Sequence, residues 1–225
     1  MPKVAIFTEG SAQIGMGHLT RCLSFAQAVS SFGAEVVFVV AGDDFAKSVV
    51  ESFQFPVTIV ESLNSLSEFP QGEMALVDSY LADLHFYKKV EERYRRKIYI
   101  DDYFRLDYPE GVILNYVPSL GIPKKYKNHC LLWGEKYHLL RKHFWDVAPK
   151  EIKGEVREVL VTFGGDDIRN LTPKVAKILL KHFKGITLNI VVGGGFKNKE
   201  ELLKLAQIHP DRVKLHFSVS AKEIT

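Results

Sequence analysis

The sequence predicts an α/β protein with parallel sheets, built as two successive series of strands and helices. Three observations predict this class. Short apolar runs that suit buried strands alternate with segments of helical periodicity. The runs show almost no polar alternation, as at residues 35–41, which is typical of sheets covered by helices on both faces. A polar segment at 143–155, with a proline, a glycine and several charges, separates the two series.

The first series begins with a buried strand at residues 3–8 and an amphipathic helix at 18–32, which Gly33 stops. Further strands are expected at 35–41, 57–60, 74–78, 97–102 and 112–115, and further helices at 44–53 and 81–95. Strands that alternate with helices in this way favour a parallel sheet with right-handed crossovers.

The second series has strands at 156–163, 186–192 and 213–217. Thr172 and Pro173 predict a helix start, with threonine as the N-cap and proline at the first helical position. Asn198 and Glu201 predict a capping box on the next helix. We therefore divide the chain into a first domain at 1–145, a linker at 146–155 and a second domain at 156–225. The second domain is short for an α/β domain, and we expect it to be incomplete and the chain to be a fragment.

Composition excludes several classes of function. The 225 residues are 46% hydrophobic and carry a net charge of +3, without a long run of Lys or Arg, so we expect no nucleic-acid partner. The two cysteines lie far apart, which suits a reducing compartment. No leader pattern opens the chain, and its longest apolar run, at 36–41, is too short to span a bilayer. We therefore expect a soluble cytoplasmic protein without a membrane partner. The sequence leaves the oligomeric state open.

The segment Gly15-Met16-Gly17-His18 places an ionisable side chain at the start of the first helix. Glycines allow a ligand to approach closely, and the unpaired N–H groups of a helix start suit a phosphate or a sugar oxygen. The same dipole disfavours a charged imidazole, so we expect a neutral His18 that can act as a general base. An ordinary tight turn with a polar first-turn histidine explains the pattern equally well. The spacing fits neither the dinucleotide fingerprint nor the P-loop.

Acidic and aromatic side chains follow other strands. Asp78-Ser79-Tyr80 and Asp101-Asp102-Tyr103 should reach the same rim as His18, where a carboxylate could orient the imidazole or bind sugar hydroxyls and Tyr80 could pack on a sugar. Each pattern is also typical of a simple loop cap. No metal-binding motif accompanies these acids, so we expect no metal site.

The second series offers one comparable turn, Gly164-Gly165-Asp166-Asp167, followed by Asn170. This turn follows the carboxyl end of a strand, where α/β sheets bind ligands. An ordinary glycine turn with solvated acids explains the pattern equally well. Arg141, just before the linker, could meet a phosphate or form a surface ion pair.

Taken in order, these segments resemble one family. They are Gln13-Ile14-Gly15-Met16-Gly17-His18, Asp78-x-Tyr80, Asp101-Asp102, Leu140-Arg141 and Phe163-Gly164-Gly165-Asp166-Asp167-x-x-Asn170-Leu171-Thr172. The sequence resembles the nucleotide-sugar hydrolases of pseudaminic acid biosynthesis, whose relatives are often labelled spore coat polysaccharide biosynthesis proteins. The resemblance implies a GT-B-like fold of two Rossmann-like domains, here with the second domain incomplete.

The resemblance also implies an activity. His18 would be the catalytic base that activates water to attack the anomeric carbon of a UDP-linked 2,4-diacetamido-2,4,6-trideoxy sugar, releasing UDP with inversion and without metal or cofactor. The substrate-binding residues would be Gly15, Gly17, Tyr80, Arg141, Gly164, Gly165 and Asn170. The family's uridine-binding region lies beyond Thr225, so we expect this chain to bind a UDP-sugar poorly by itself. Two alternatives remain: a GT-B glycosyltransferase with a UDP-sugar donor, and a non-catalytic nucleotide-sugar-binding protein.

Overall fold

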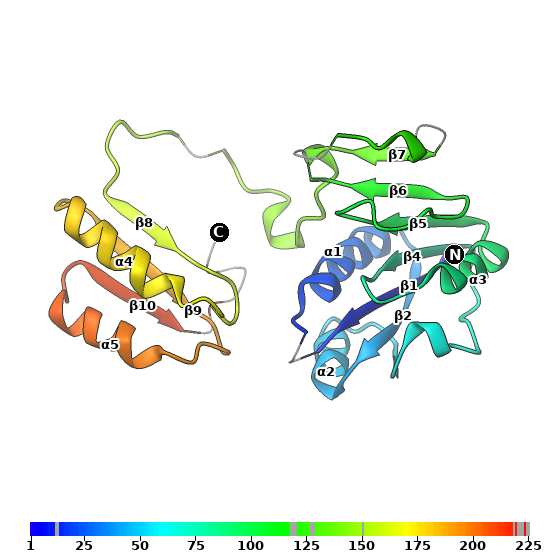
Figure 1. Ribbon diagram of the computed structural model, residues 1–225, viewed down its shortest axis with the longest axis horizontal. Coiled ribbons are helices and arrows are strands. Elements are labelled where there is room, and N and C mark those ends of the chain that lie inside the picture. Colours follow the sequence, from blue (N-terminus) through cyan, green and yellow to red (C-terminus); the bar gives the residue numbers. More distant parts are fainter. Residues whose placement is uncertain are drawn as a thin grey trace. The chain divides into compact units, whose positions relative to one another are not determined.

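The structure is a computed structural model that describes residues 1–11, 14–117, 121–126, 129–149, 151–217, 219 and 223. It divides into two compact units, Met1–Trp145 and Asp146–Thr225. Residues 146–155, predicted as a linker, fall within the second unit in this division. Each unit is built around a parallel sheet that carries helices (Figure 1), so the predicted α/β class with parallel sheets is confirmed.

The first unit contains a seven-stranded sheet with the order β3-β2-β1-β4-β5-β6-β7 and parallel pairing throughout. Its strands are β1 (Lys3–Gly10), β2 (Glu35–Gly42), β3 (Val57–Val60), β4 (Met74–Asp78), β5 (Arg96–Ile100), β6 (Val112–Asn115) and β7 (Cys130–Trp133). The order changes direction at β1, because β2 and β3 lie on one side of it and β4 to β7 on the other. Open α/β sheets bind ligands outside the carboxyl ends of the strands at such a point.

Helices cover both faces of this sheet. On one face, α1 (Gly17–Ser31) packs against β1, where Leu19 shares a core with Ile6, and α2 (Asp44–Ser52) packs against β2 and β3. On the other face, α3 (Leu84–Arg93) packs Phe86 against Phe7. Successive residues of β1 thus enter opposite cores, which explains why this strand shows no polar alternation. The described residues of this unit also form four 3-10 turns: η1 (Leu63–Ser65), η2 (Lys124–Tyr126), η3 (Glu135–Tyr137) and η4 (Lys142–Phe144).

Several elements of the first unit differ from the sequence prediction. Helix α3 begins at Leu84 instead of residue 81, because the Asp83 side chain caps it by accepting a hydrogen bond from Phe86 N at 2.9 Å. Strand β5 ends at Ile100 instead of residue 102. Strand β7 was not predicted, because its four residues pair only with β6 and form a short apolar run without helical flanks.

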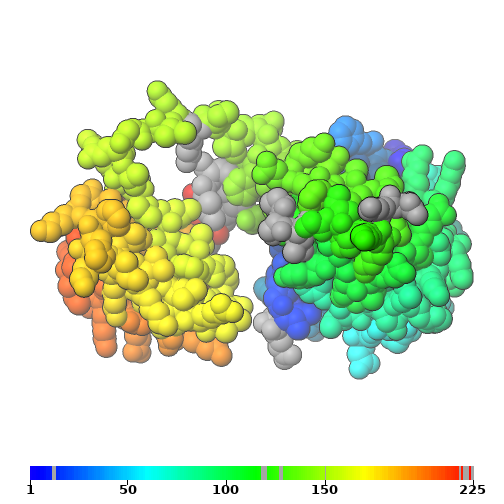
Figure 2. Space-filling view, turned by 45° about the horizontal axis from the view of Figure 1, so that its top comes forward, coloured from blue at the N-terminus to red at the C-terminus, as the bar shows by residue number. Residues whose placement is uncertain are grey.

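The second unit contains three described strands in the order β10-β9-β8, all parallel: β8 (Glu158–Val161), β9 (Thr187–Val192) and β10 (Val213–Phe217). Helices α4 (Leu171–His182) and α5 (Lys199–Ile208) lie in the described part of this unit, with their atoms side by side at its surface (Figure 2). Leu188, Ile190 and Val192 of β9 are buried, whereas the residues between them are only half-buried. The helices therefore bury one face of this sheet more completely than the other.

The predicted cap of α4 is wrong, and that of α5 is confirmed only in position, because Asn198 precedes the helix without a side-chain capping bond. Asn170, not Thr172, precedes α4, and the Asp167 carboxylate accepts hydrogen bonds from the N–H groups of Leu171 and Thr172, each at 2.8 Å. An aspartate five residues before Thr172 reaches the helix start because its backbone is left-handed, with φ 42°. Glu201 does not form the predicted box with Asn198; it pairs with Lys177 Nζ at 2.6 Å.

Candidate functional site

The candidate site lies in the first unit, at the carboxyl ends of β1 and β4, where the strand order changes direction. Glu9 is the penultimate residue of β1, and Asp78 is the last residue of β4. His18 is the second residue of α1, the helix that follows β1. Parallel pairing of β1 with β4 therefore places two carboxylates beside the start of one helix.

His18 and Asp78 form a hydrogen-bonded pair. The imidazole Nδ1 lies 2.7 Å from Asp78 Oδ1, and the Asp78 side chain is fully buried whereas that of His18 is 18% exposed. A buried carboxylate with cationic neighbours accepts hydrogen bonds, so we assign the hydrogen of a neutral imidazole to Nδ1. Nε2 is then left with a free lone pair. Asp78 thus favours this tautomer and orients the ring, while Arg21 Nη2, 3.0 Å from the same Nδ1, donates to Asp78 Oδ1.

Arg21 joins this pair to two further strand ends. Its guanidinium donates to both oxygens of Asp78, and one nitrogen, Nη1, donates to Asp102 Oδ2 and to the Tyr116 hydroxyl, each at 2.6 Å. Burial alone would lower the pKa of Arg21, but the hydrogen bonds and negative charges of Asp78 and Asp102 outweigh it and raise the pKa. Arg21 is therefore a permanent cation whose hydrogen bonds connect the carboxyl ends of β4, β5 and β6.

Tyr80 packs against the imidazole. The two rings meet edge to face with their centroids 4.3 Å apart, and the Tyr80 hydroxyl donates to Asp102 Oδ2 at 2.7 Å. Burial and the hydrogen bond to Asp102 raise the pKa of Tyr80, so its hydroxyl stays protonated. Tyr80 is still 37% exposed as a residue, and Tyr103, whose ring centroid lies 5.5 Å from that of Tyr80, is 68% exposed. These rings leave an accessible aromatic surface next to His18.

Glu9 faces the other nitrogen of the imidazole. Its Oε1 lies 3.7 Å from His18 Nε2, and its side chain is only 4% exposed. The carboxylate accepts hydrogen bonds from the Ser79 hydroxyl, Tyr80 N at 2.9 Å and Leu81 N at 3.3 Å. These donors, all from the loop after β4, stabilise the buried negative charge.

No protein-family model matches this chain. The chain is 28% identical over 233 residues to the uncharacterized protein MJ1062 of Methanocaldococcus jannaschii, covering 96% of this chain and 48% of that protein. It is 26% identical over 221 residues to the UDP-2,4-diacetamido-2,4,6-trideoxy-beta-L-altropyranose hydrolase of Campylobacter jejuni, covering 92% of this chain and 75% of the hydrolase. The chain thus spans about half the length of the first relative and three quarters of the second.

Two solved structures share the fold. MurG of Acinetobacter baumannii aligns with a TM-score of 0.57 and 12% identity, covering 99% of this chain and 68% of MurG. The glycotransferase of kitacinnamycin aligns with a TM-score of 0.56 and 12% identity, covering 96% of this chain and 71% of that enzyme. At this identity the likeness concerns the fold alone, and it confirms the expected GT-B-like α/β fold.

The glycine loop before His18 is partly described. Gly15 has φ 89°, a left-handed conformation that favours glycine, and its N–H donates to Ser11 O at 3.0 Å. Gly17 is the exposed first residue of α1, with open space where a Cβ would lie. Gln13, part of the resemblance motif, lies outside the described residues.

The other predicted binding residues belong to η4 and to the second unit. Arg141 is exposed at the start of η4, with its guanidinium 5.7 Å from the Phe144 ring centroid. In the second unit, Gly164 and Gly165 are exposed after β8, and Gly165 O accepts a hydrogen bond from Gly195 N at 3.1 Å. Asn170 donates to Glu201 Oε2 at 3.3 Å. Their roles in substrate binding stay predictions.

Sequence reasoning missed Glu9, Arg21 and Tyr116 as members of the site. Arg21 had a detectable signal, because a residue three positions after His18 lies on the same face of a helix. Glu9 also had one, since it is an acid at the end of an otherwise apolar strand. Tyr116 follows β6 and carries no comparable signal.

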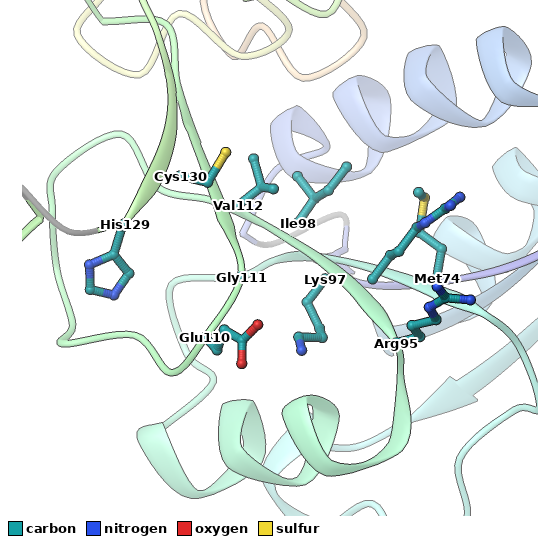
Figure 3. Close-up of a pocket in the computed structure, with 10 residues that line it drawn as sticks. Met74, Arg95, Lys97, Ile98, Glu110, Gly111, Val112, His129 and Cys130 are labelled. Carbon is teal, nitrogen blue, oxygen red and sulfur yellow. The ribbon is translucent and has the colours of Figure 1, made fainter.

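A hollow of about 560 Å³ lies at the opposite edge of the same sheet (Figure 3). It is lined by the first residues of β4 to β7, with Lys97 and Glu110 pointing to one side and Ile98 and Val112 to the other. It contains none of the predicted site residues, and ligands in such sheets usually bind at the carboxyl ends of the strands. The His18 cluster is therefore the better candidate site.

The described part of the chain also bears on metal binding and on membrane insertion. Within it, three or more His, Cys, Asp or Glu side chains nowhere gather in a way that could hold a metal ion. Its helices are all too short or too polar to cross a bilayer.

Proposed function

We propose that the protein hydrolyses a UDP-linked sugar, with His18 as the general base that activates water. The single observation that carries this proposal is the hydrogen bond from His18 Nδ1 to the buried Asp78, which leaves Nε2 as a proton acceptor at a ligand-binding edge of the sheet. The similarity to the Campylobacter jejuni hydrolase supports the substrate class, a UDP-linked 2,4-diacetamido-2,4,6-trideoxy sugar. Surface polysaccharide or nonulosonic acid biosynthesis is the setting that this substrate suggests.

In the proposed reaction, Nε2 takes one proton from water while the water oxygen forms a bond to the anomeric carbon. The bond from that carbon to the diphosphate oxygen breaks, and UDP leaves with the electron pair. Attack opposite the leaving group inverts the configuration. The Asp78 carboxylate, 2.7 Å from Nδ1, stabilises the imidazolium that forms.

Other residues would bind the substrate. We propose that Gly15 and Gly17 approach the sugar phosphate at the start of α1, and that the exposed face of Tyr80 packs on the sugar. Four further residues are proposed as substrate contacts on the resemblance alone: Arg141, Gly164, Gly165 and Asn170.

The test uses the full-length protein, a panel of UDP-linked deoxy-acetamido sugars and a chelator. We expect release of UDP and free sugar in the presence of the chelator, and a loss of about 10²- to 10⁴-fold in kcat for His18→Ala. His85→Ala, which changes an exposed histidine on α3, is the matched control and should keep wild-type activity. Activity that survives His18→Ala would refute the role given to the imidazole.

A glycosyltransferase is the second candidate, because one of the solved structures with this fold is the glycotransferase of kitacinnamycin and the sequence resembles a GT-B-like family. Reaction in water enriched in oxygen-18 separates the two candidates. Hydrolysis with inversion places the label on the anomeric oxygen of the released sugar. A transferase would give labelled sugar only slowly and would consume the donor faster when an acceptor is added.

A further inference from the structure

Glu9 is placed unusually for a structural acid. It lies inside the parallel sheet, one residue before the end of β1, in a strand whose other inner residues are apolar apart from Thr8. Carboxylates at such positions are rarely buried unless they are paired or hydrogen-bonded. Here three donors from the β4 loop stabilise the charge, while one oxygen still faces His18.

The distance between Glu9 and His18 defines what can lie there. Glu9 Oε1 and His18 Nε2 are 3.7 Å apart, which is too long for a direct hydrogen bond. Both atoms are acceptors when Nδ1 carries the imidazole hydrogen. A single water molecule can lie about 2.8 Å from both atoms if it sits to one side of the line that joins them. Such a water can donate one hydrogen to each acceptor.

The hydrogen bonds that Glu9 already accepts leave a lone pair on Oε1 that can accept a hydrogen bond from this water. Oε2 accepts from the Ser79 hydroxyl and Leu81 N, whereas Oε1 accepts only from Tyr80 N among the described residues. A carboxylate oxygen has room for a second hydrogen bond. Glu9 Oε1 therefore combines a fixed position with an unused acceptor site directed at the base.

We propose that Glu9 positions the attacking water together with His18. This inference rests on the proposed hydrolase function. One hydrogen of the water is donated to His18 Nε2 and is transferred there as the oxygen attacks the anomeric carbon. The other hydrogen remains bonded to that oxygen and is donated to Glu9 Oε1, so the reacting lone pair is held in one direction. No proton passes to Glu9, and UDP leaves with the electron pair of the broken bond.

The kinetic test compares Glu9→Gln with Ser79→Ala in the full-length protein. Glu9→Gln keeps the size of the side chain but removes its charge. Ser79→Ala removes the hydroxyl that donates to Glu9 Oε2 and accepts from Leu81 N and Ala82 N, but it keeps the charge of Glu9 and the hydrogen bond from Tyr80 N to Oε1. We expect Glu9→Gln to lower kcat by about 10²-fold with KM changed less than about 3-fold, and Ser79→Ala to lower kcat by less than about 5-fold.

Rescue by azide separates chemistry from structure. Azide has no hydrogen to donate and needs neither acceptor, so it should restore UDP release in Glu9→Gln and yield the glycosyl azide. A loop that had merely shifted would misplace Tyr80 and the sugar, and azide would not correct that. Equal losses in Glu9→Gln and Ser79→Ala without rescue by azide, or a Glu9→Gln enzyme as fast as wild type, would overturn the proposal.

A crystal structure of the wild-type protein tests the geometry without any assay. We expect an ordered water within hydrogen-bond distance of both His18 Nε2 and Glu9 Oε1. A direct hydrogen bond between those two atoms, or a site without this water, would overturn the inference even in an active enzyme. Failure of the proposed function is a different result: the wild-type protein then releases no UDP from any sugar of the panel, and the catalytic role of Glu9 is refuted with it.

Discussion

Replacing Asp78 by asparagine tests the centre of the site most directly. The Asp78 side chain is fully buried and accepts hydrogen bonds from Arg21 Nε and Nη2, with His18 Nδ1 2.7 Å away. In Asp78→Asn one of its two oxygens becomes an amide nitrogen, which is a donor and must face a donor of Arg21 or the hydrogen on His18. Removing one partner of a buried ion pair costs about 3–5 kcal/mol. Arg21 keeps Asp102 and Tyr116 as partners, so we expect a loss near 3 kcal/mol.

The two tryptophans make this loss measurable in one unit of the chain. Trp133 and Trp145 both belong to the first unit, so tryptophan fluorescence during urea unfolding reports on that unit alone. With a slope of about 2 kcal/mol per molar urea, a loss of 3 kcal/mol shifts the midpoint by about 1.5 M. Asp107→Asn, at an exposed acid of the same unit, is the matched control and should change stability by less than about 0.5 kcal/mol.

The same variant should also change the imidazole. An amide nitrogen that donates to Nδ1 favours the tautomer with its hydrogen on Nε2, which removes the proposed base. Nitrogen-15 NMR distinguishes the two neutral tautomers. A matched aspartate-to-asparagine change in a serine protease lowers kcat about 10⁴-fold for this reason, and we expect a loss of similar order in UDP release. An unchanged unfolding midpoint together with an unchanged tautomer would refute the reasoning.

Two further predictions concern the close approach of β1 to β2 and the cap of α4. Gly42→Ala would place a Cβ 2.2 Å from the carbonyl oxygen of Gly10, so β1 and β2 must move apart. We expect the free energy of unfolding, followed by tryptophan fluorescence, to fall by about 1–3 kcal/mol. Gly121→Ala, where a Cβ would meet open space, is the control and should lose no stability. Asp167→Ala uncaps α4 and should cost about 1 kcal/mol, measured by hydrogen exchange of the α4 amides. Burial opposes it, but the hydrogen bonds from the start of α4 lower the pKa of Asp167. The cap is therefore fully present above the ordinary range of an aspartate and is lost as the pH falls through the lowered pKa, so wild type and Asp167→Ala should converge in acid.

The elements that sequence alone predicted well are those with a strong local signal. The strands β3, β4, β6 and β10 begin and end at the predicted residues, because each is an apolar run bounded by polar or turn residues. Strand β7 was missed because its stability depends on pairing with β6, which is a tertiary contact. The cap of α4 was misplaced because Asp167 reaches the helix start through a left-handed turn that sequence pattern does not reveal.

The candidate site shows the same division between local and tertiary information. The position of His18 in a first turn and of Asp78 at a strand end followed from local patterns. Their meeting depends on the pairing of β1 with β4, which skips two intervening strands in the chain. A series of alternating strands and helices indicates that strand ends share one edge but not which of them are neighbours. The hydrogen bonds from Arg21 to Asp78, Asp102 and Tyr116 join residues 57 to 95 positions apart in the sequence. A local sequence pattern cannot predict contacts over that separation.

The balance of charge around His18 bears on how a UDP-sugar would bind. The carboxylates of Glu9 and Asp78 flank the imidazole, that of Asp102 accepts from Arg21 and Tyr80, and the guanidinium of Arg21 opposes their negative charge. A diphosphate placed among them would be repelled, whereas the N–H groups at the start of α1 offer a partial positive charge. The proposed reaction therefore favours a pose with the phosphates toward the glycine loop and the anomeric carbon toward Glu9 and His18. Positive charge that develops on that carbon as the bond to UDP breaks would then be stabilised by the nearest carboxylate, that of Glu9, so the same negative charge that repels the leaving group would favour the transition state.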